Sequence, residues 1–181
     1  MASLKEQLPS CLQGRVCLVG VGNPAYGDDG VGVRLAEILK SEVRSPTSDV
    51  RSDTARSDAS EFGVRSVIVA GTTPERWLGR LADGGFDTVL FLDAVEIGSA
   101  PGSVVLLSAD AMTARYPQVS THRLSLGLLG RLLEAGGRTK VWLLGIQPES
   151  LRQGTVLSRS VAATVDYLAV LLREEPAEVL A

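Results

Sequence analysis

Apolar residues follow two different spacings along this chain, one typical of buried strands and one typical of amphipathic helices. Runs of strand length, most of them almost entirely apolar, predict strands at residues 15–22, 64–70, 86–93, 103–107 and 140–145. Apolar residues that recur every three or four positions predict helices at residues 30–43, 74–82, 122–135 and 155–173. Strands and helices therefore alternate along most of the chain.

The near-continuous apolar character of the strands indicates the type of sheet. Strands buried on both faces are typical of parallel sheets that are covered by helices. We therefore expect an α/β fold, a three-layer α/β/α sandwich with a mostly parallel central sheet of about five strands. The short run at 103–107, which follows a Pro-Gly turn, is expected at an edge. Residues 1–181 are expected to form a single domain, with residues 1–14 as an N-terminal extension.

Residues 45–61 interrupt this alternation. They contain Pro46 and many Ser, Asp and Arg residues, without an apolar period. A loop of this length is uncommon in a compact domain and is usually either functional or disordered. We expect a polar loop there, and it is a candidate for contact with a substrate.

Carboxylates occur where the predicted strands end. Asp28 and Asp29 follow the first strand and a glycine turn, directly before a predicted helix, and Asp93 ends the most apolar strand. The only histidine of the chain, His122, begins a later helix. Since open α/β sheets place their sites at the carboxyl ends of the strands, we expect these residues to share one rim of the sheet. Two acids and one imidazole form a ligand set suited to nickel, zinc or a similar ion.

Each of these residues also has an ordinary structural explanation. An acid next to a helix start frequently caps unpaired N–H groups, which would account for Asp28 or Asp29. Asp93 could be a hydrogen-bonded turn acid, because an unpaired carboxylate is costly at the end of a buried strand. His122 could be a surface or capping histidine. Their coincidence at strand and helix ends nevertheless favours a site.

Composition and charge narrow the class of protein. The chain has 18 basic and 21 acidic residues, a formal net charge of -3 and no basic stripe, so we expect no nucleic-acid partner. The spacing of Cys11 and Cys17 matches neither a CxxC redox pair nor a zinc knuckle, and a reducing compartment fits them best. No signal peptide and no apolar run of ~20 residues occurs, so we expect a cytoplasmic protein without membrane contact.

Nucleotide binding is a second interpretation of the glycine turn. Residues 20–25 read GVGNPA and satisfy the G-x-G-x-x-A form of a dinucleotide fingerprint. However, Pro24 removes an N–H donor, and the two aspartates that follow place negative charge where the phosphates would lie. The second strand also ends in Gly71 and Thr72 rather than in the acid that would hold a ribose hydroxyl. Nucleotide binding is therefore disfavoured.

Other catalytic arrangements lack their sequence signatures. No G-x-S-x-G elbow surrounds Ser120 or Ser125, as a serine hydrolase would need. Cys17 falls inside the first strand rather than at a helix start, where a cysteine nucleophile would be activated. With a single histidine the chain cannot form the H-E-x-x-H motif of a zinc peptidase. The acids and His122 remain the best candidates for chemistry.

Four blocks of the sequence together resemble one known family. They read GVGNPAYGDDGVG at residues 20–32, LDA at 92–94, STH at 120–122 and GIQPESL at 145–151. In this order they are similar to the hydrogenase maturation endopeptidases, over most of the chain. The resemblance implies an endopeptidase, aspartic-type by family assignment. Such an enzyme removes a C-terminal extension from the nickel-loaded precursor of a [NiFe] hydrogenase large subunit.

The resemblance also implies roles for individual residues. Asp29, Asp93 and His122 match the positions that recognise nickel and act in catalysis, while Asp28 and Thr72 are secondary candidates. No cofactor is expected to be permanently bound, because the substrate presents the nickel, and the protein is expected to act as a monomer. The group that activates the water molecule stays open. So does the alternative of a non-catalytic nickel-binding or chaperone module that acts on the same precursor.

Overall fold

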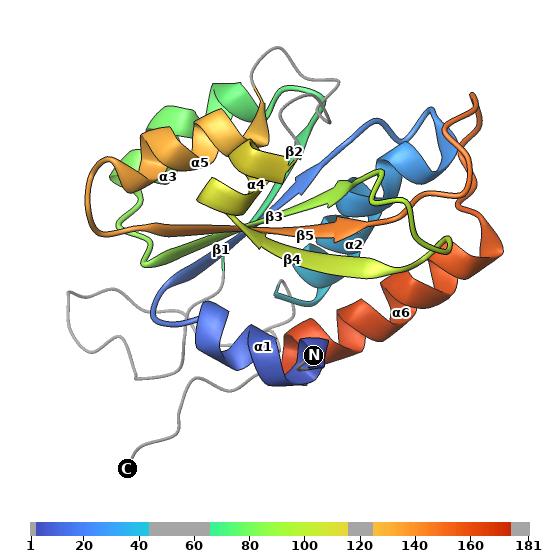
Figure 1. The fold of residues 1–181 in the computed structure, drawn as a ribbon, viewed down its shortest axis with the longest axis horizontal. Coiled ribbons are helices and arrows are strands. Elements are labelled where there is room, and N and C mark those ends of the chain that lie inside the picture. Colours follow the sequence, from blue (N-terminus) through green and yellow to red (C-terminus); the bar gives the residue numbers. More distant parts are fainter. Residues whose placement is uncertain (1–2, 44–65, 116–124, 175–181) are drawn as a thin grey trace, which may run out of the picture.

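The chain folds around one five-stranded sheet (Figure 1). The computed structural model describes residues 3–43, 66–115 and 125–174. In the spatial order β2-β1-β3-β5-β4, the strands are β1 (Val16–Val21), β2 (Ser66–Gly71), β3 (Thr88–Ala94), β4 (Val104–Ser108) and β5 (Lys140–Ile146). All neighbouring strands are parallel except β4 and β5, which are antiparallel. The predictions of a mostly parallel sheet and of its edge strand are confirmed.

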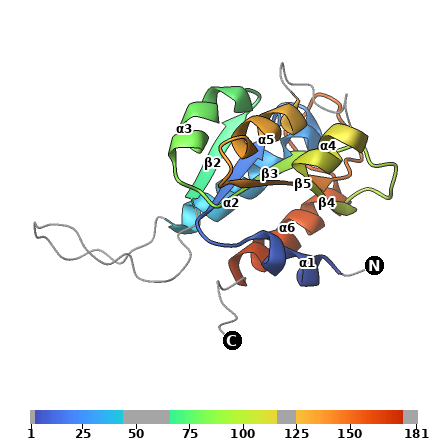
Figure 2. The same ribbon diagram turned by 60° about the vertical axis from the view of Figure 1, so that its left-hand side comes forward.

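Helices cover both faces of the sheet, as Figures 1 and 2 show. One layer contains α1 (Leu4–Cys11), α2 (Val31–Val43) and α6 (Arg159–Glu174), and the other contains α3 (Leu78–Asp83), α4 (Ala109–Arg115) and α5 (Leu126–Glu134). Because successive strand residues point to opposite faces, Leu18 and Leu90 pack with α2 and α6, whereas Val19 and Phe91 pack with α5. The predicted three-layer arrangement is confirmed.

Several helix boundaries differ from the predicted ones. The first predicted helix is preceded by the 3-10 helix η1 (Gly27–Gly30), and the second is divided into η2 (Pro74–Trp77) and α3. The last helix begins at Arg159 rather than at residue 155, because the residues before it contact the loop that follows β1. The polar loop at 45–61, and His122 at the predicted start of α5, lie outside the described residues.

Two helices are not apparent in the sequence pattern. The helix α1 lies within the expected N-terminal extension and contains Pro9, yet it buries Leu8 completely in the core shared with α6. The helix α4 has seven residues and buries Met112. Both are too short for a helical period to stand out, and packing holds them. In the described ranges no helix is both long and apolar enough to span a membrane.

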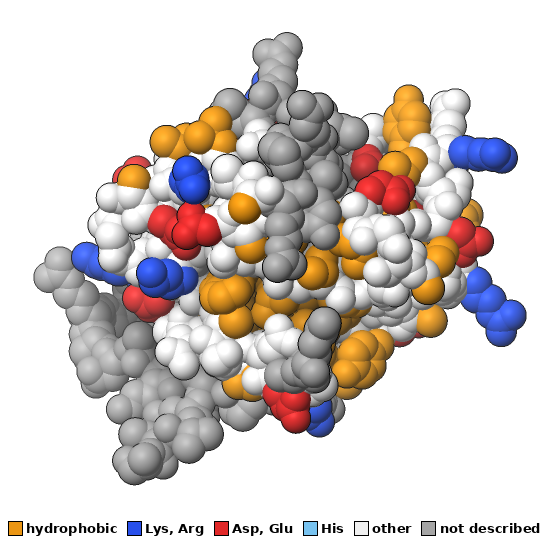
Figure 3. All heavy atoms as spheres, viewed as in Figure 1, with side chains coloured by type: hydrophobic (Ala, Val, Ile, Leu, Met, Phe, Trp, Pro, Cys, Tyr) orange, Lys and Arg blue, Asp and Glu red, His pale blue; other side chains and the backbone are white. Residues whose placement is uncertain are grey.

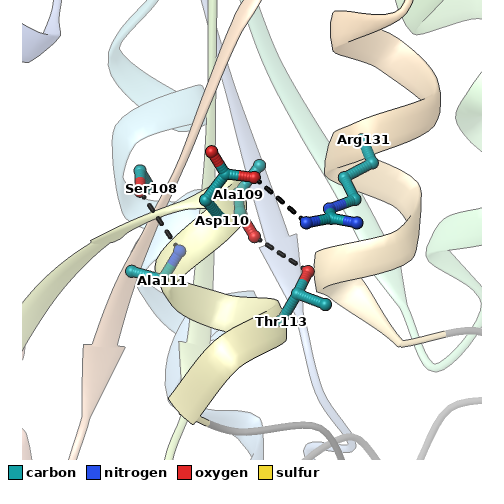
Figure 4. Close-up of polar contacts among 6 residues, drawn as sticks. All are labelled: Ser108, Ala109, Asp110, Ala111, Thr113 and Arg131. Atoms are coloured by element: carbon teal, nitrogen blue, oxygen red, sulfur yellow. Dashed lines mark hydrogen bonds and ion pairs between the residues drawn. The ribbon is translucent and has the colours of Figure 1, made fainter.

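Polar contacts at the surface support α4 (Figure 4). The Ser108 hydroxyl accepts a hydrogen bond from the Ala111 N–H at 3.3 Å and so caps the start of the helix. Asp110 pairs with Arg131 of α5 at 3.3 Å, and these side chains are 84% and 56% exposed. Exposed ion pairs contribute at most about 1 kcal/mol. A neutral residue at position 110 is therefore expected to change stability little.

Glycines allow α2 to approach the sheet closely. A Cβ atom on Gly32 would lie 1.9 Å from the carbonyl oxygen of Leu92 and 2.5 Å from that of Val21. A Cβ atom on Gly20 would lie 2.4 Å from the Cβ atom of Ala36. Neither of these Cβ atoms can be accommodated unless the helix moves away from the strands. Helix–sheet packing therefore explains these glycines without a bound phosphate.

We expect Gly32→Ala to lower the free energy of unfolding by about 1–3 kcal/mol or more, because the added methyl group meets backbone that cannot yield. Gly79→Ala is the matched control, since Gly79 is in α3 with no atom within 4 Å of the added Cβ. This control is expected to leave stability unchanged or raise it by up to about 1 kcal/mol. Urea unfolding measures both variants. Equal effects of the two substitutions would contradict the packing argument.

Candidate functional site

The connections of the sheet diverge between β1 and β3. From β1 the chain passes through α2 to β2 on one side, whereas β3 lies on the other side of β1. Open α/β sheets bind ligands in the crevice that such a divergence leaves at the carboxyl ends of the strands. Asp29 lies in the loop after β1, and Asp93 is the penultimate residue of β3. The structure thus places both acids at this rim.

Asp29 and Asp93 both lie close to Gly22. The φ angle of Gly22 is 121°, and a Cβ atom there would lie 1.8 Å from the carbonyl oxygen of Asp29 and 3.6 Å from Oδ1 of Asp93. Oδ2 of Asp29 accepts a hydrogen bond from the Asn23 N–H at 2.9 Å. Oδ1 of Asp93 accepts one from the Ala94 N–H, also at 2.9 Å. Glycine is needed at position 22 because a side chain would displace the backbone that carries Asp29.

Burial and repulsion both disfavour the charge on Asp93, whose side chain is 5% exposed. Burial raises the pKa of Asp93 well above its ordinary value of 3.8, and the nearby charge of Asp29 raises it further. The hydrogen bond from Ala94 opposes these effects only in part. A cation that approached the pair would relieve the repulsion and stabilise both carboxylates. The pair can therefore bind a metal ion or accept a proton from water.

Asp28 is buried and fully hydrogen-bonded, with 1% of its surface exposed. Oδ2 accepts hydrogen bonds from the Glu149 N–H at 2.8 Å, the Ser150 N–H at 3.0 Å and the Ser158 hydroxyl at 2.9 Å. Oδ1 accepts one from the Ser158 N–H at 2.7 Å. These bonds hold residues 147–158, which connect β5 to α6 and which we call the β5–α6 segment, against the glycine turn.

The two neighbouring aspartates therefore have different environments. Burial alone would raise the pKa of Asp28, but the hydrogen bonds from Ser158, Ser150 and Glu149 outweigh it, and the pKa lies below the ordinary value of 3.8. Asp28 is an ionised structural acid at neutral pH. Both carboxylate oxygens of Asp28, the secondary candidate of the sequence, are occupied by these bonds, whereas Asp29 accepts a hydrogen bond from the Asn23 N–H through Oδ2.

The β5–α6 segment also holds the loop that follows β3. Gln147 is 5% exposed, and its Oε1 accepts hydrogen bonds from the Ile97 N–H at 2.8 Å and the Ser99 N–H at 3.4 Å. Its Nε2 donates to Glu96 Oε2 at 2.8 Å. No role for Gln147 is apparent from the sequence pattern. A single amide directly after an apolar strand is the signal that could have identified it, since a buried polar side chain needs partners.

Thr72 and His122 are the remaining predicted residues. Thr72 is exposed directly after β2, next to Gly71, whose carbonyl oxygen accepts a hydrogen bond from the Gly22 N–H at 3.1 Å. This bond places Thr72 beside the glycine turn. His122 is not among the residues that the structure describes. Among those that it does describe, no group of three or more His, Cys, Asp or Glu side chains could hold a metal ion.

The two cysteines are free and buried. Burial raises the pKa of Cys17 to about 12, against a smaller opposite effect of the Arg80 charge, and burial also raises the pKa of Cys11. A nucleophilic cysteine needs a depressed pKa and access to solvent. Neither cysteine therefore fits a role as the nucleophile of a protease, as the position of Cys17 within a strand had indicated.

Comparisons with known proteins identify the family. A family model described as hydrogenase maturation protease matches residues 55–175, more than half of the chain. The hydrogenase 2 maturation protease of Escherichia coli K12 is 28% identical over 156 residues, which cover 84% of this chain and 84% of that protein. The hydrogenase 3 maturation protease of the same strain is 29% identical over 133 residues, 73% of this chain and 72% of that protein.

A solved structure is similar over nearly the whole chain. The [NiFe] hydrogenase maturation protease HycI from Thermococcus kodakarensis KOD1 matches with a TM-score of 0.74 and 27% sequence identity, over 93% of this chain and 97% of that one. This likeness extends across the sheet and both helical layers. Together with the family model and the four sequence blocks, it shows that the chain belongs to the hydrogenase maturation protease family.

Proposed function

We propose that this protein is the endopeptidase that removes the C-terminal extension of a nickel-loaded [NiFe] hydrogenase large-subunit precursor. The observation that carries the proposal is the pair of Asp29 and Asp93 at the divergence of β1 and β3. Asp93 is buried, and its pKa is raised by burial and by the charge of Asp29. Such a pair attracts a cation, and membership of the family points to the nickel ion of the precursor as that cation.

We assign Asp29 and Asp93, with His122 as the third group, to recognition of the nickel that the precursor itself holds. A closed structural metal site usually has four protein ligands, so three groups suit a metal that is already bound elsewhere. Ionised carboxylates and a neutral imidazole are ligands for such an ion. Contact with the nickel would hold the scissile peptide beside the acids, which supplies orientation to the reaction.

The partners of the reaction are part of the same proposal. We propose that the protein holds no resident cofactor and acts as a monomer in the cytoplasm, without nucleic acid or membrane. Thr72, exposed beside the glycine turn, is a proposed contact for the extended end of the precursor. Elemental analysis of the purified protein tests whether it holds a metal cofactor. Sedimentation tests whether it is a monomer.

Incubation with nickel-loaded and nickel-free precursor tests the proposed activity. We expect intact-mass spectrometry to show one shortened product from the loaded precursor and none from the nickel-free form, because only nickel brings the scissile peptide to the acids. A precursor that already lacks its extension is the control and should keep its mass. Equal cleavage of both forms would refute nickel recognition. Binding that depends on nickel, without any change of mass, would instead support the non-catalytic module.

A further inference from the structure

Exposed apolar side chains lie beside the acidic site. Tyr26, two residues before Asp28, is 46% exposed, and Leu151 and Val156 of the β5–α6 segment are 43% and 81% exposed. In Figure 3, orange hydrophobic side chains at the upper right, where Figure 1 places the chain between β5 and α6, lie among both red acidic and blue basic side chains. Exposed apolar groups collected at one place are typical of an interaction surface.

This part of the surface is held firmly to the site. The Gly27 N–H donates to the Gly154 carbonyl oxygen at 2.7 Å, and the Gly154 N–H donates to the Ala25 carbonyl oxygen at 2.9 Å. These bonds join the loop of Tyr26 to the β5–α6 segment, and the four bonds to Asp28 fix the same segment. The apolar side chains therefore lie on the loop that carries Asp29 or on a segment hydrogen-bonded to it, and a partner bound to them has a defined orientation to the acids.

Exposed arginines and exposed acids, among them Glu149, both border these side chains. Arg152 and Arg159 are exposed, and neither forms an ion pair within the described parts of the chain. Arg34 lies near them and donates to the Thr155 carbonyl oxygen at 3.5 Å, but Glu37 already pairs with it. Since Arg152 and Arg159 have no ion-pair partner among the described residues, they are available to the carboxylates of a partner.

We propose that Tyr26, Leu151, Arg152, Val156 and Arg159 form a docking surface for the folded body of the hydrogenase precursor, which meets it with an apolar patch bordered by acidic side chains. This inference rests on the proposed function. Docking at this surface brings the nickel site of the precursor to Asp29 and Asp93.

A second copy of this chain fits the docking surface less well. In a two-fold dimer the same patch faces itself. Arg152 and Arg159 of both copies would then lie close together, and juxtaposed like charges weaken an interface. Glu149, the nearest acid in sequence, already accepts a hydrogen bond from the Ser160 hydroxyl at 2.9 Å. An acidic partner is therefore the better complement.

Charged substitutions on the docking surface test the inference. We expect Leu151→Asp and Val156→Asp to weaken binding of the nickel-loaded precursor at least about 10-fold, as substitutions of central contact residues do. Leu132→Asp on α5 and Val170→Asp on α6 are matched controls, because these residues are 48% and 47% exposed and lie outside the docking surface. Arg152→Glu should weaken binding and reduce its dependence on salt. Biolayer interferometry measures affinity, and circular dichroism verifies folding.

The outcomes separate this inference from the proposed function. If the wild-type protein neither binds nor cleaves the precursor, both fail. If the wild-type protein cleaves it, while folded Leu151→Asp and Val156→Asp bind as tightly as the controls, only the docking surface is overturned. If the wild-type protein sediments as a dimer and these variants sediment as monomers, the occupant is a second copy and the inference is again overturned. Selective loss of precursor binding supports it.

Discussion

Asp93→Asn is expected to lower the rate of precursor cleavage by at least about 100-fold and to make the folded protein more stable. Asparagine has nearly the same shape, but it offers no charge to nickel and accepts no proton. Burial and the charge of Asp29 disfavour the ionised carboxylate in the folded state, and a neutral amide removes that penalty. Cleavage assays and urea unfolding at neutral pH measure the two effects.

The gain in stability of Asp93→Asn has a defined dependence on pH. A carboxyl group whose pKa is raised by folding stabilises the protein below its unfolded pKa of about 3.9. That contribution is lost as the pH rises through the folded pKa. The amide resembles the protonated acid at every pH, so the advantage of the variant over the wild-type protein grows from acid to neutral pH. A variant less stable than the wild-type protein at pH 7 would rule out this account.

Related substitutions separate the members of the site. Asp29→Asn and His122→Ala are expected to reduce cleavage in the same way. Asp29→Asn also removes a charge that raises the pKa of Asp93. In the pH profile of the residual cleavage activity of this variant, the acid limb should therefore move to lower pH. Asp110→Asn is the control, because the side chain of Asp110 is 84% exposed on α4. The cleavage activity of this variant should equal that of the wild-type protein. Full activity of Asp29→Asn would remove this residue from the site.

Asp28→Asn is expected to lower the free energy of unfolding by about 2–3 kcal/mol, as loss of hydrogen bonds to a buried charged group does. The amide nitrogen cannot accept the bonds that one carboxylate oxygen now accepts, so buried N–H donors of the β5–α6 segment lose their partner. Cleavage should fall as well, because this segment supports the loop that carries Asp29 and the loop that follows Asp93. Urea unfolding measures the change.

Acid titration provides the control for Asp28→Asn. The folded pKa of Asp28 is depressed, so its contribution is fully present above the ordinary pKa of 3.8 and is lost as the pH falls through the lower folded value. The difference in stability between the wild-type protein and Asp28→Asn should therefore shrink below about pH 4. Asp110→Asn should change stability by less than about 0.5 kcal/mol. A constant difference down to pH 2 would count against a role of the charge.

The fold was predictable because its signals are local. The run that became β1 is apolar throughout, and those that became β3 and β5 are apolar except at their ends, as is typical of strands buried on both faces. The run that became β4 is short and follows a Pro-Gly turn, which indicated its place at the edge. By contrast, α1 and α4 depend on a few buried side chains, such as Leu8 and Met112, and their spacing carries no clear period.

The site was predictable only in part, for a related reason. Strand ends identified Asp29 and Asp93, because topology alone brings the ends of neighbouring parallel strands together. The separate role of Asp28 depends on donors such as Glu149 and Ser158, which lie 121 and 130 residues further along the chain. A local sequence pattern does not reveal hydrogen bonds between residues so far apart in the chain. The start of the last helix was misplaced for the same reason, since residues before Arg159 are fixed by contacts with the glycine turn.

The long separation between Asp28 and its donors has a consequence for synthesis of the protein. A nascent chain exposes Asp28 early, but the N–H and hydroxyl donors of Ser158 emerge from the ribosome only after 130 further residues. Until then the loop that carries Asp29 lacks its anchor. The anchor of the acidic site can therefore form only after both of these distant parts of the chain have been synthesised.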